Sequence, residues 1–172
     1  RTMRAALEAL VQGIAIFDPD GTLSLWNKRL GELLDLPPSH LDRGAPAERL
    51  LGWMRDRFTF SQLQPDRLAA WIARGKGRRP LTFELRLGAD RTLDLGLREL
   101  PGGGFVLAVT DVTAEREANR ALFEVNELLE QRVTERTAEL REAVARAERA
   151  NASKNRFITA ASHDLLQPLS AG

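Results

Sequence analysis

The residue with the clearest capacity for chemistry is His163, which lies near the end of the chain beside Asp164. An imidazole nitrogen is a nucleophile, and to attack an electrophile brought from outside it must face solvent. Four residues after Asp164 comes Pro168, which has no N–H and so leaves the carbonyl of Asp164 without its helical partner. We therefore expect His163 on the surface of a helix that can bend just beyond it.

The helix that must position His163 is predicted by composition, because residues 114–162 contain no Gly and no Pro and are rich in Ala, Glu, Arg and Leu. Its apolar residues recur at spacings of three, four or seven, which is the seam of a coiled coil. One register from residue 129 onward puts Ala161 at position a and Asp164 at d, so His163 falls on the outward c position. The predicted seam contains Leu122, Val125, Leu129, Val133, Leu140, Val144 and Ala147.

The register of this seam changes along the helix. The steps from Val125 to Leu129 and from Leu129 to Val133 are both four residues, so two frames join through a stutter. The seam also includes Ala and Arg positions and is only weakly apolar. We expect a signalling helix that shifts between two packings, and the alternative is a plain spacer helix.

The segment around His163 resembles the phosphoacceptor box of sensor histidine kinases over residues 151–171. In that family an acidic residue follows the acceptor His, and Pro-Leu follows five positions on. The resemblance implies that His163 is the phosphoacceptor and that Asp164 orients the imidazole and accepts its proton. It also implies ATP and Mg²⁺ in the parent kinase, and transfer of the phosphate to an Asp of a response-regulator receiver domain.

Two positions depart from the commonest form of this box. Leu166 stands where Arg is frequent, and Gln167 stands where Thr or Asn is frequent. In the family, that Thr or Asn helps to position water for dephosphorylating the regulator. Gln167 carries an amide on a longer side chain, so it is a candidate phosphatase position. This variant is similar to a subgroup of hybrid kinases that carry their own receiver domain.

The remainder of a kinase is not visible in this sequence. Neither a second dimerisation helix nor the Asn-rich and Gly-rich segments of an ATP-binding domain follow His163. We expect a fragment that cannot phosphorylate itself alone and that serves at most as a substrate in trans.

The part before residue 113 predicts a mixed α and β domain, since it holds all three Trp and most of the Gly and Pro. Short turns such as residues 18–21, where Pro fixes φ and Gly allows φ > 0, imply antiparallel pairing. Asn27 is expected to cap the helix that follows it. Helices are expected at residues 2–12, 28–34, 47–57 and 65–74, and strands at residues 13–17, 22–26, 81–87, 92–100 and 105–110.

This order of elements, with the segment 13–21 and Trp26-Asn27, resembles a PAS sensor domain over residues 3–113. The ending Asp111-Val112-Thr113 is similar to the Asp-x-Thr element with which PAS domains joined to output helices close their last strand. We expect Asp111 to accept hydrogen bonds from the backbone or an Arg, and Thr113 to cap the exiting helix. The resemblance implies a role in signal transmission for both residues, shared with the bend at Pro168. The alternative is that they only end a strand and start a helix.

The ligand of such a domain stays open. A light-sensing flavin domain of this class needs a Cys, and the chain has none. His40 is the only candidate axial ligand for haem before the coil, and its loop-like surroundings favour a surface residue. We expect no metal site.

Two other groups of residues have simple interpretations. The basic stretch at residues 74–79 lacks the spacing of a phosphate loop, which favours a solvated connection. Four aromatic residues could line a pocket, but aromatic residues at their spacing favour a place in the core. These are Trp26, Trp53, Phe58 and Trp71.

Composition limits the partners and the compartment. The chain has 25 Lys and Arg against 24 Asp and Glu, a balance that favours neither nucleic acid nor an acidic membrane surface. No run approaches 18 apolar residues, so we expect no membrane segment in this fragment. The absence of Cys fits a cytoplasmic protein. The expected partners are a second copy of the chain and a receiver domain.

These predictions combine into one architecture: an α+β fold with a PAS-like five-stranded antiparallel sheet and helices, followed by a long parallel α-helical coiled coil. Expected boundaries are an amphipathic helix at 1–12, a PAS domain at 13–113, a signalling coil at 114–152 and the start of the phosphoacceptor helix at 153–172. The PAS domain would control autophosphorylation of His163 through the coil. The alternative is a ligand-free PAS module that only sets the oligomeric state, and a cyclic-dinucleotide enzyme is disfavoured because no such motif follows the coil.

Overall fold

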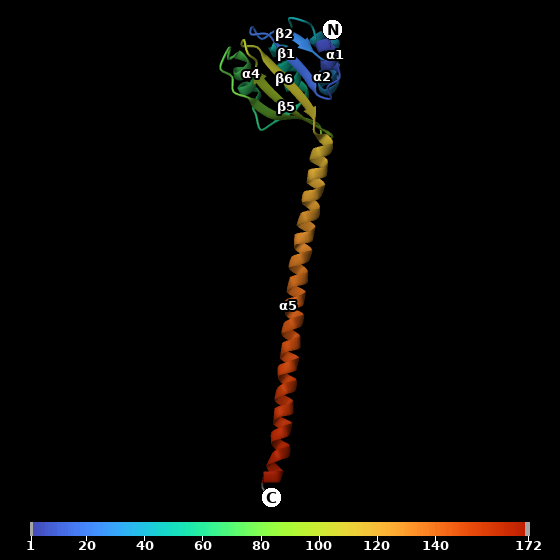
Figure 1. The fold of residues 1–172 in the computed structure, drawn as a ribbon, viewed down its shortest axis with the longest axis vertical. Helices are drawn as coiled ribbons and strands as arrows, with labels where there is room; N and C mark the ends of the chain where they lie inside the picture. Colours follow the sequence, from blue (N-terminus) through green and yellow to red (C-terminus); the bar gives the residue numbers. More distant parts are fainter. Residues whose placement is uncertain (1, 171–172) are drawn as a thin grey trace. The chain divides into compact units, whose positions relative to one another are not determined.

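The computed structural model describes residues 2–170, and side chains through residue 167 (Figure 1). It forms an α+β unit that extends to Ala118 and a helical unit that begins at Asn119. The elements are α1 (Thr2–Glu8), β1 (Gly13–Phe17), β2 (Leu23–Trp26), α2 (Lys28–Leu34), a 3₁₀ turn η1 (Pro38–His40), α3 (Ala47–Arg57), β3 (Thr59–Ser61), α4 (Pro65–Ala73), β4 (Leu81–Leu87), β5 (Arg91–Glu99), β6 (Phe105–Asp111) and α5 (Thr113–Ser170).

The sheet has the strand order β2-β1-β6-β5-β4-β3, and every neighbouring pair is antiparallel. The first and last long strands of the domain therefore lie side by side, with Gly13 of β1 opposite Val109 of β6. The predicted turn at residues 18–21 is present, and the N–H of Gly21 donates to the carbonyl of Asp18 across it at 2.9 Å. Gly21 has φ of +80°, a conformation that favours glycine.

Two predictions about the elements are wrong. The sheet has six strands and not five, because Thr59–Ser61 pairs with β4 at the sheet edge, where Phe60 stacks on Phe83 with centroids 5.6 Å apart. Three residues are too few for an alternating pattern, so only the pairing across the fold defines this strand. The first helix ends at Glu8 and not at residue 12, and the carbonyls of Leu7 and Gln12 bind Asn27.

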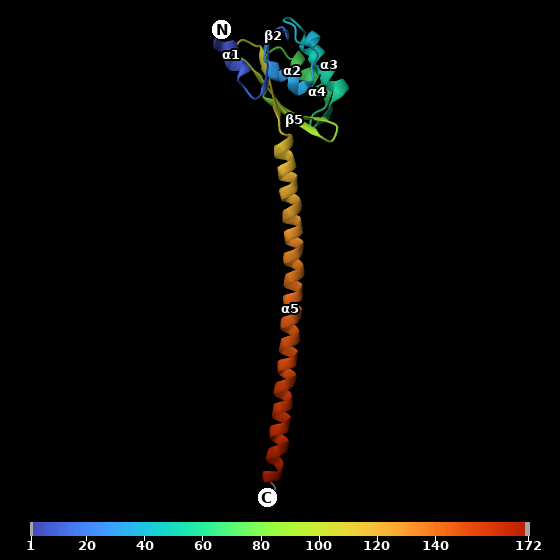
Figure 2. The same cartoon turned by 90° about the vertical axis from the view of Figure 1, so that its right-hand side faces the viewer.

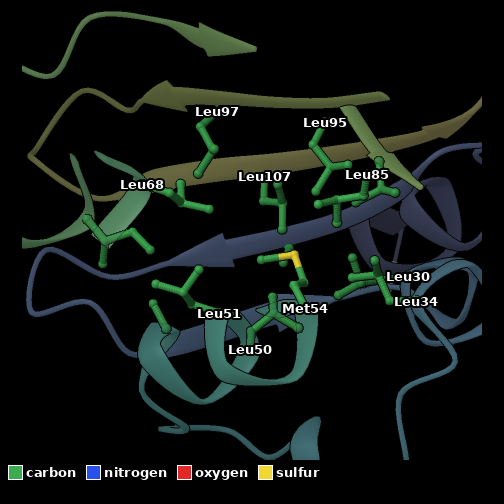
Figure 3. Close-up of a cluster of buried hydrophobic side chains, with 14 of the residues drawn as sticks. Leu30, Leu34, Leu50, Leu51, Met54, Leu68, Leu85, Leu95, Leu97 and Leu107 are labelled. Atoms are coloured by element: carbon green, nitrogen blue, oxygen red, sulfur yellow. The ribbon is translucent and has the colours of Figure 1, made fainter. Parts of the chain in front are cut away.

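The core lies on one face of the sheet. Alternate residues of β4, β5 and β6 point to this face, and helices α2, α3 and α4 gather over it (Figure 2). Figure 3 shows Leu85, Leu95 and Leu107 of the sheet facing Leu50 and Met54 of α3, and all five are buried. The expectation of aromatic core residues is confirmed, since one is buried and three are half-buried against the core: Phe58, Trp26, Trp53 and Trp71.

Helix α5 is one continuous helix of 58 residues, about 87 Å long at 1.5 Å per residue (Figure 1). Between residues 113 and 167, at least half of the surface of each large apolar side chain of α5 is exposed within the single chain, including Leu122, Val125, Leu129, Val133, Leu140 and Val144. Among residues 2–170, no helix combines the length and the hydropathy that a membrane crossing requires.

Candidate functional site

His163 lies on α5 with its side chain 69% exposed to solvent. Its Nδ1 atom is 3.8 Å from Oδ1 of Asp164, whose side chain is 81% exposed. This distance is that of an ion pair when the imidazole is protonated, and is too long for a direct hydrogen bond. Because Nδ1 faces the carboxylate, Nε2 is the ring nitrogen directed away from it and open to attack an electrophile.

The surface around His163 is a shallow groove along one side of α5, lined by Asn155, Arg156, Thr159, Ala160, His163 and Asp164. The Thr159 hydroxyl donates to the carbonyl of Asn155 at 2.9 Å, so it is occupied by the helix backbone. Arg156 lies seven residues before His163 and brings a positive charge that attracts an anionic group. Arg156 was not predicted as a site residue, although its spacing of seven from His163 already places both on one face of the helix.

Two further predicted site residues follow His163 on the same helix. Gln167 is exposed, and α5 continues through Pro168 to Ser170. The side chain of Pro168 lies outside the described part, as do residues 171 and 172 of the predicted phosphoacceptor segment.

A second group of candidate residues connects the sheet to the start of α5. Oδ1 of Asp111 accepts hydrogen bonds from the N–H of Thr113 at 3.0 Å and from its hydroxyl at 2.6 Å. The Thr113 hydroxyl in turn accepts the N–H of Thr92, on β5, at 3.0 Å. Asp111 thus binds backbone as predicted. The predicted helix cap by Thr113 is wrong, because its hydroxyl binds Asp111 and β5 and is not directed to the N–H groups of α5.

The charge of Asp111 is favoured by these contacts. The hydrogen bond from the Thr113 hydroxyl is the main cause that lowers the pKa of the Asp111 carboxyl, and the positive charges of Arg91 and Arg29 add to the effect. Partial burial opposes it. Asp111 is therefore ionised at neutral pH, the state in which it accepts both hydrogen bonds.

Two ion pairs at the same end of the domain were not predicted from the sequence. Arg116, in the first turn of α5, pairs with Glu84 of β4. Arg91 pairs with Asp35 at 3.4 Å, at the end of α2. The partners are 32 and 56 residues apart, so no local pattern in the sequence relates them.

The basic stretch at residues 74–79 is solvated as expected except at one position. Arg78 is only 6% exposed, which corrects the prediction for that residue. Its guanidinium donates to the carbonyls of Trp71, Ile72 and Gly103 and lies over the rings of Trp71 and Phe105. These contacts tie the end of α4 to the hairpin between β5 and β6.

The interior of the α+β unit contains a small cavity. The space available to the centre of a water-sized sphere is about 10 Å³, which is close to the minimum for one water molecule. Its lining is entirely apolar and includes Met54, Phe83 and Phe105. His40 lies elsewhere, half-buried in η1 with its ring centroid 5.0 Å from that of Trp53.

Comparison with known proteins concerns the fold of the α+β unit. A family model described as the PAS fold matches residues 7–120, well over half of the chain. The chain therefore belongs to the PAS-fold family. The solved structure of the PAS domain of BvgS from Bordetella pertussis is 15% identical to this chain in sequence and has a TM-score of 0.50. The match covers 73% of this chain and 95% of that one. The PAS domain of an HTR-like protein from Haloarcula marismortui is 17% identical with a TM-score of 0.42, covering 64% and 94%.

The match to one curated relative extends beyond the PAS domain of this chain. The non-motile and phage-resistance protein of Caulobacter vibrioides is 27% identical over 179 aligned residues, which cover 98% of this chain. The aligned part is 20% of that protein, so the chain spans about a fifth of its length. The similarity thus includes the α5 region as well as the PAS domain.

Proposed function

We propose that this chain is the sensory and signal-transmitting region of a two-component sensor histidine kinase. In this proposal the PAS domain controls phosphorylation of His163 through a coiled coil, and the phosphate then passes to an Asp of a receiver domain. The ATP and Mg²⁺ belong to the parent kinase. The observation that carries the proposal is the exposed imidazole of His163 beside the Asp164 carboxylate. Both residues lie in a segment of thirteen residues, 157–169, that resembles the phosphoacceptor box of sensor histidine kinases.

The chemistry assigns a role to each of these two residues. Nε2 of His163 attacks the γ-phosphorus of ATP, the bond from that phosphorus to the bridging oxygen breaks, and ADP leaves. When Nε2 gains the phosphoryl group, the ring carries a positive charge as long as Nδ1 keeps its proton. A nearby negative charge must stabilise this cation, or a base must remove the proton. Asp164, whose carboxylate lies on the Nδ1 side, stabilises that proton and can accept it.

Phosphorylation of the chain in trans tests this role directly. The chain is incubated with Mg²⁺, labelled ATP and a longer form of the protein that carries the parent ATP-binding domain. We expect a phosphate that is labile to acid and stable to base on the wild-type chain and on His40→Gln, and none on His163→Gln. The chain has two histidines, so His40→Gln is a matched control. Equal labelling of His163→Gln and the wild type would refute the assignment.

The proposal also requires a parallel homodimer through α5. Leu140 is 65% exposed in the single chain and occupies an a position of the predicted register. Replacing it by Glu in both copies removes two buried side chains worth about 1.5–3 kcal/mol each, so we expect dimer affinity to fall at least about a hundredfold. Light scattering across a concentration series measures this change, and Arg141→Glu, on the next exposed residue, is the control.

Cysteine crosslinking examines the register of the coil. Because the chain has no native Cys, single Cys residues placed from 118 to 150 report only on their own positions. A coil that shifts between two packings predicts a different crosslinking pattern in each signalling state. The same pattern in both states would contradict the shift.

A second candidate function is a ligand-free PAS module that only sets the oligomeric state. The observation that favours it is the small apolar cavity of about 10 Å³ in the core. Mass spectrometry of the chain purified under native conditions separates the two candidates on this point. A small molecule released in a stoichiometric amount would contradict the ligand-free module, and recovery of none would support it.

A further inference from the structure

Helix α1 is held to the PAS domain mainly by polar contacts. None of its residues is buried, and Met3 in the helix and Val11 just after it are 75% and 81% exposed. A segment with few buried apolar contacts opens at a lower free energy than the core does. Helix α1 is therefore an element whose position can change while the rest of the domain stays folded.

The contacts that hold α1 converge on the beginning of α2. Asn27, which is fully buried, donates to the carbonyls of Leu7 and Gln12, both at 2.9 Å. Its side-chain oxygen accepts the N–H groups of Ile14 and Leu30 at 2.9 and 3.1 Å. One amide thus joins α1 and the segment after it to β1 and to the first turn of α2.

Two further hydrogen bonds reinforce this attachment. The carboxylate of Glu8 accepts the N–H of Lys28 at 3.0 Å, one of the first N–H groups of α2 that lack a partner within the helix. The guanidinium of Arg29 donates to the carbonyl of Val11 at 3.2 Å. If α1 leaves its place, α2 loses both contacts at its beginning.

From this position, a short route leads to the start of α5. The amide of Gln12 donates to the hydroxyl of Thr110 at 3.0 Å. Thr110 directly precedes Asp111, which binds Thr113 in the first turn of α5. The residue that the α1 segment contacts is therefore the chain neighbour of Asp111, which binds the start of α5.

A second route runs through α2. At its far end, Arg91 contacts the carbonyl of Leu33 and the carboxylate of Asp35. The next residue of β5, Thr92, donates its N–H to the Thr113 hydroxyl and accepts the N–H of Val112 at 3.0 Å. The two ends of α2 are thus attached to α1 and to the junction that begins α5.

We propose that α1 is the element through which this PAS domain receives its input, and that release of α1 loosens the first turn of α5. The closed apolar core supports this route, because a cavity of about 10 Å³ leaves little room for a ligand to act from within. The proposal concerns the link between two helices and does not depend on phosphate acceptance by His163. It can therefore fail or succeed independently of the kinase assignment.

Hydrogen exchange in the full 172-residue chain tests the link. The double variant Glu8→Ala/Gln12→Ala removes two side-chain contacts of the α1 segment. We expect amide exchange at residues 112–118 to rise by about two- to fivefold, the factor that loss of a modest hydrogen-bond contribution produces. Faster exchange confined to residues 2–14 would overturn the proposal.

The middle of the route has its own matched pair of variants. Arg91→Met removes the contacts to α2, while Arg98→Met alters an exposed Arg on the same strand. We expect faster exchange at residues 112–118 and at the end of α2 only for Arg91→Met. Equal exchange at residues 112–118 in the two variants would contradict the second route.

Thermodynamic coupling must also act in reverse. Thr113→Val removes the hydroxyl that binds Asp111 and Thr92, and it leaves every direct contact of α1 intact. We expect faster exchange at residues 9–14 in this variant. Unchanged exchange there, in a chain whose circular dichroism is that of the wild type, would show that the two helices are independent.

Discussion

The burial of Arg78 makes a quantitative prediction about the stability of the PAS domain. Its guanidinium donates to the carbonyls of Trp71, Gly103 and Ile72 at 3.1, 2.9 and 2.8 Å. Its central carbon lies 5.3 Å from the ring centroid of Trp71 and 4.8 Å from that of Phe105. Arg78→Met keeps the apolar stem of the side chain and removes the charge and all three donors.

The magnitude follows from these contacts. Three hydrogen bonds from a charged donor contribute about 1.5–3 kcal/mol each, and the two ring contacts about 0.5–1 kcal/mol each. Burial of the guanidinium charge offsets several kcal/mol of that sum. We expect Arg78→Met to lower the free energy of unfolding of the PAS domain by about 3 kcal/mol. In a domain of this size, that change lowers Tm by roughly 10 °C.

Urea unfolding followed by tryptophan fluorescence measures the loss, because all three Trp lie in the PAS domain. Arg79→Met is the matched control, since the Arg79 side chain is exposed and only its carbonyl accepts a hydrogen bond, from Trp71. Arg78→Lys keeps the charge but lacks the planar fork that reaches several carbonyls at once, so we expect it to recover less than half of the loss. A loss below about 1 kcal/mol for Arg78→Met, with an unchanged m-value, would refute the energetic role of these contacts.

Three further predictions concern the junction, the glycines and Asn27. Because folding lowers the pKa of Asp111, the stabilising contribution of its carboxylate is present above the unfolded pKa of about 3.9 and is lost as the pH falls through the folded value. NMR titration of Asp111 should find a midpoint below about 3.9, and Thr113→Val should move that midpoint upward. A midpoint that Thr113→Val leaves unmoved would contradict the hydrogen bond as the cause of the lowered pKa. Gly104→Ala should destabilise the PAS domain by about 1–3 kcal/mol, because the added Cβ would lie 2.4 Å from a backbone oxygen of β1. Gly52→Ala, in open space on α3, should stabilise the domain by about 0.5–1 kcal/mol. Denaturant unfolding that gives both changes in stability the same sign would rule out this explanation. Asn27→Asp should lower the free energy of unfolding by about 2–3 kcal/mol, since an acceptor would replace the amide that donates to two carbonyls, and a thermal melt like that of the wild type would argue against the network.

The local structure of this chain could be predicted where local chemistry decides it. The turn at residues 18–21 has Pro and Gly at positions whose backbone angles they favour, so the hairpin of β1 and β2 was predictable. The Asn27 cap and the helix after it follow from the same kind of preference, and the cap forms through the N–H of Leu30. The exposure of His163 was expected from its position on a helix, and its side chain is 69% exposed.

The remaining features depend on residues that the fold brings together from distant parts of the sequence. Nothing in the short run at Thr59–Ser61 predicts a strand until β4 lies beside it. Arg78 resembles its exposed neighbours in sequence and is buried only because the end of α4 and the turn after β5 supply three carbonyls.

Apart from the short edge strand β3, the sequence by itself determined the order of helices and strands, the antiparallel hairpins and the long helix that carries His163, because short-range backbone preferences and side-chain periodicity specify these features. Only the tertiary structure decided which residues attach α5 to the sheet. Thr113 forms a hydrogen bond with Thr92, which is 21 residues away in the sequence, and Arg116 pairs with Glu84, which is 32 residues away. The same packing set the volume of the core cavity, since that volume depends on how side chains from several elements fill one shared space.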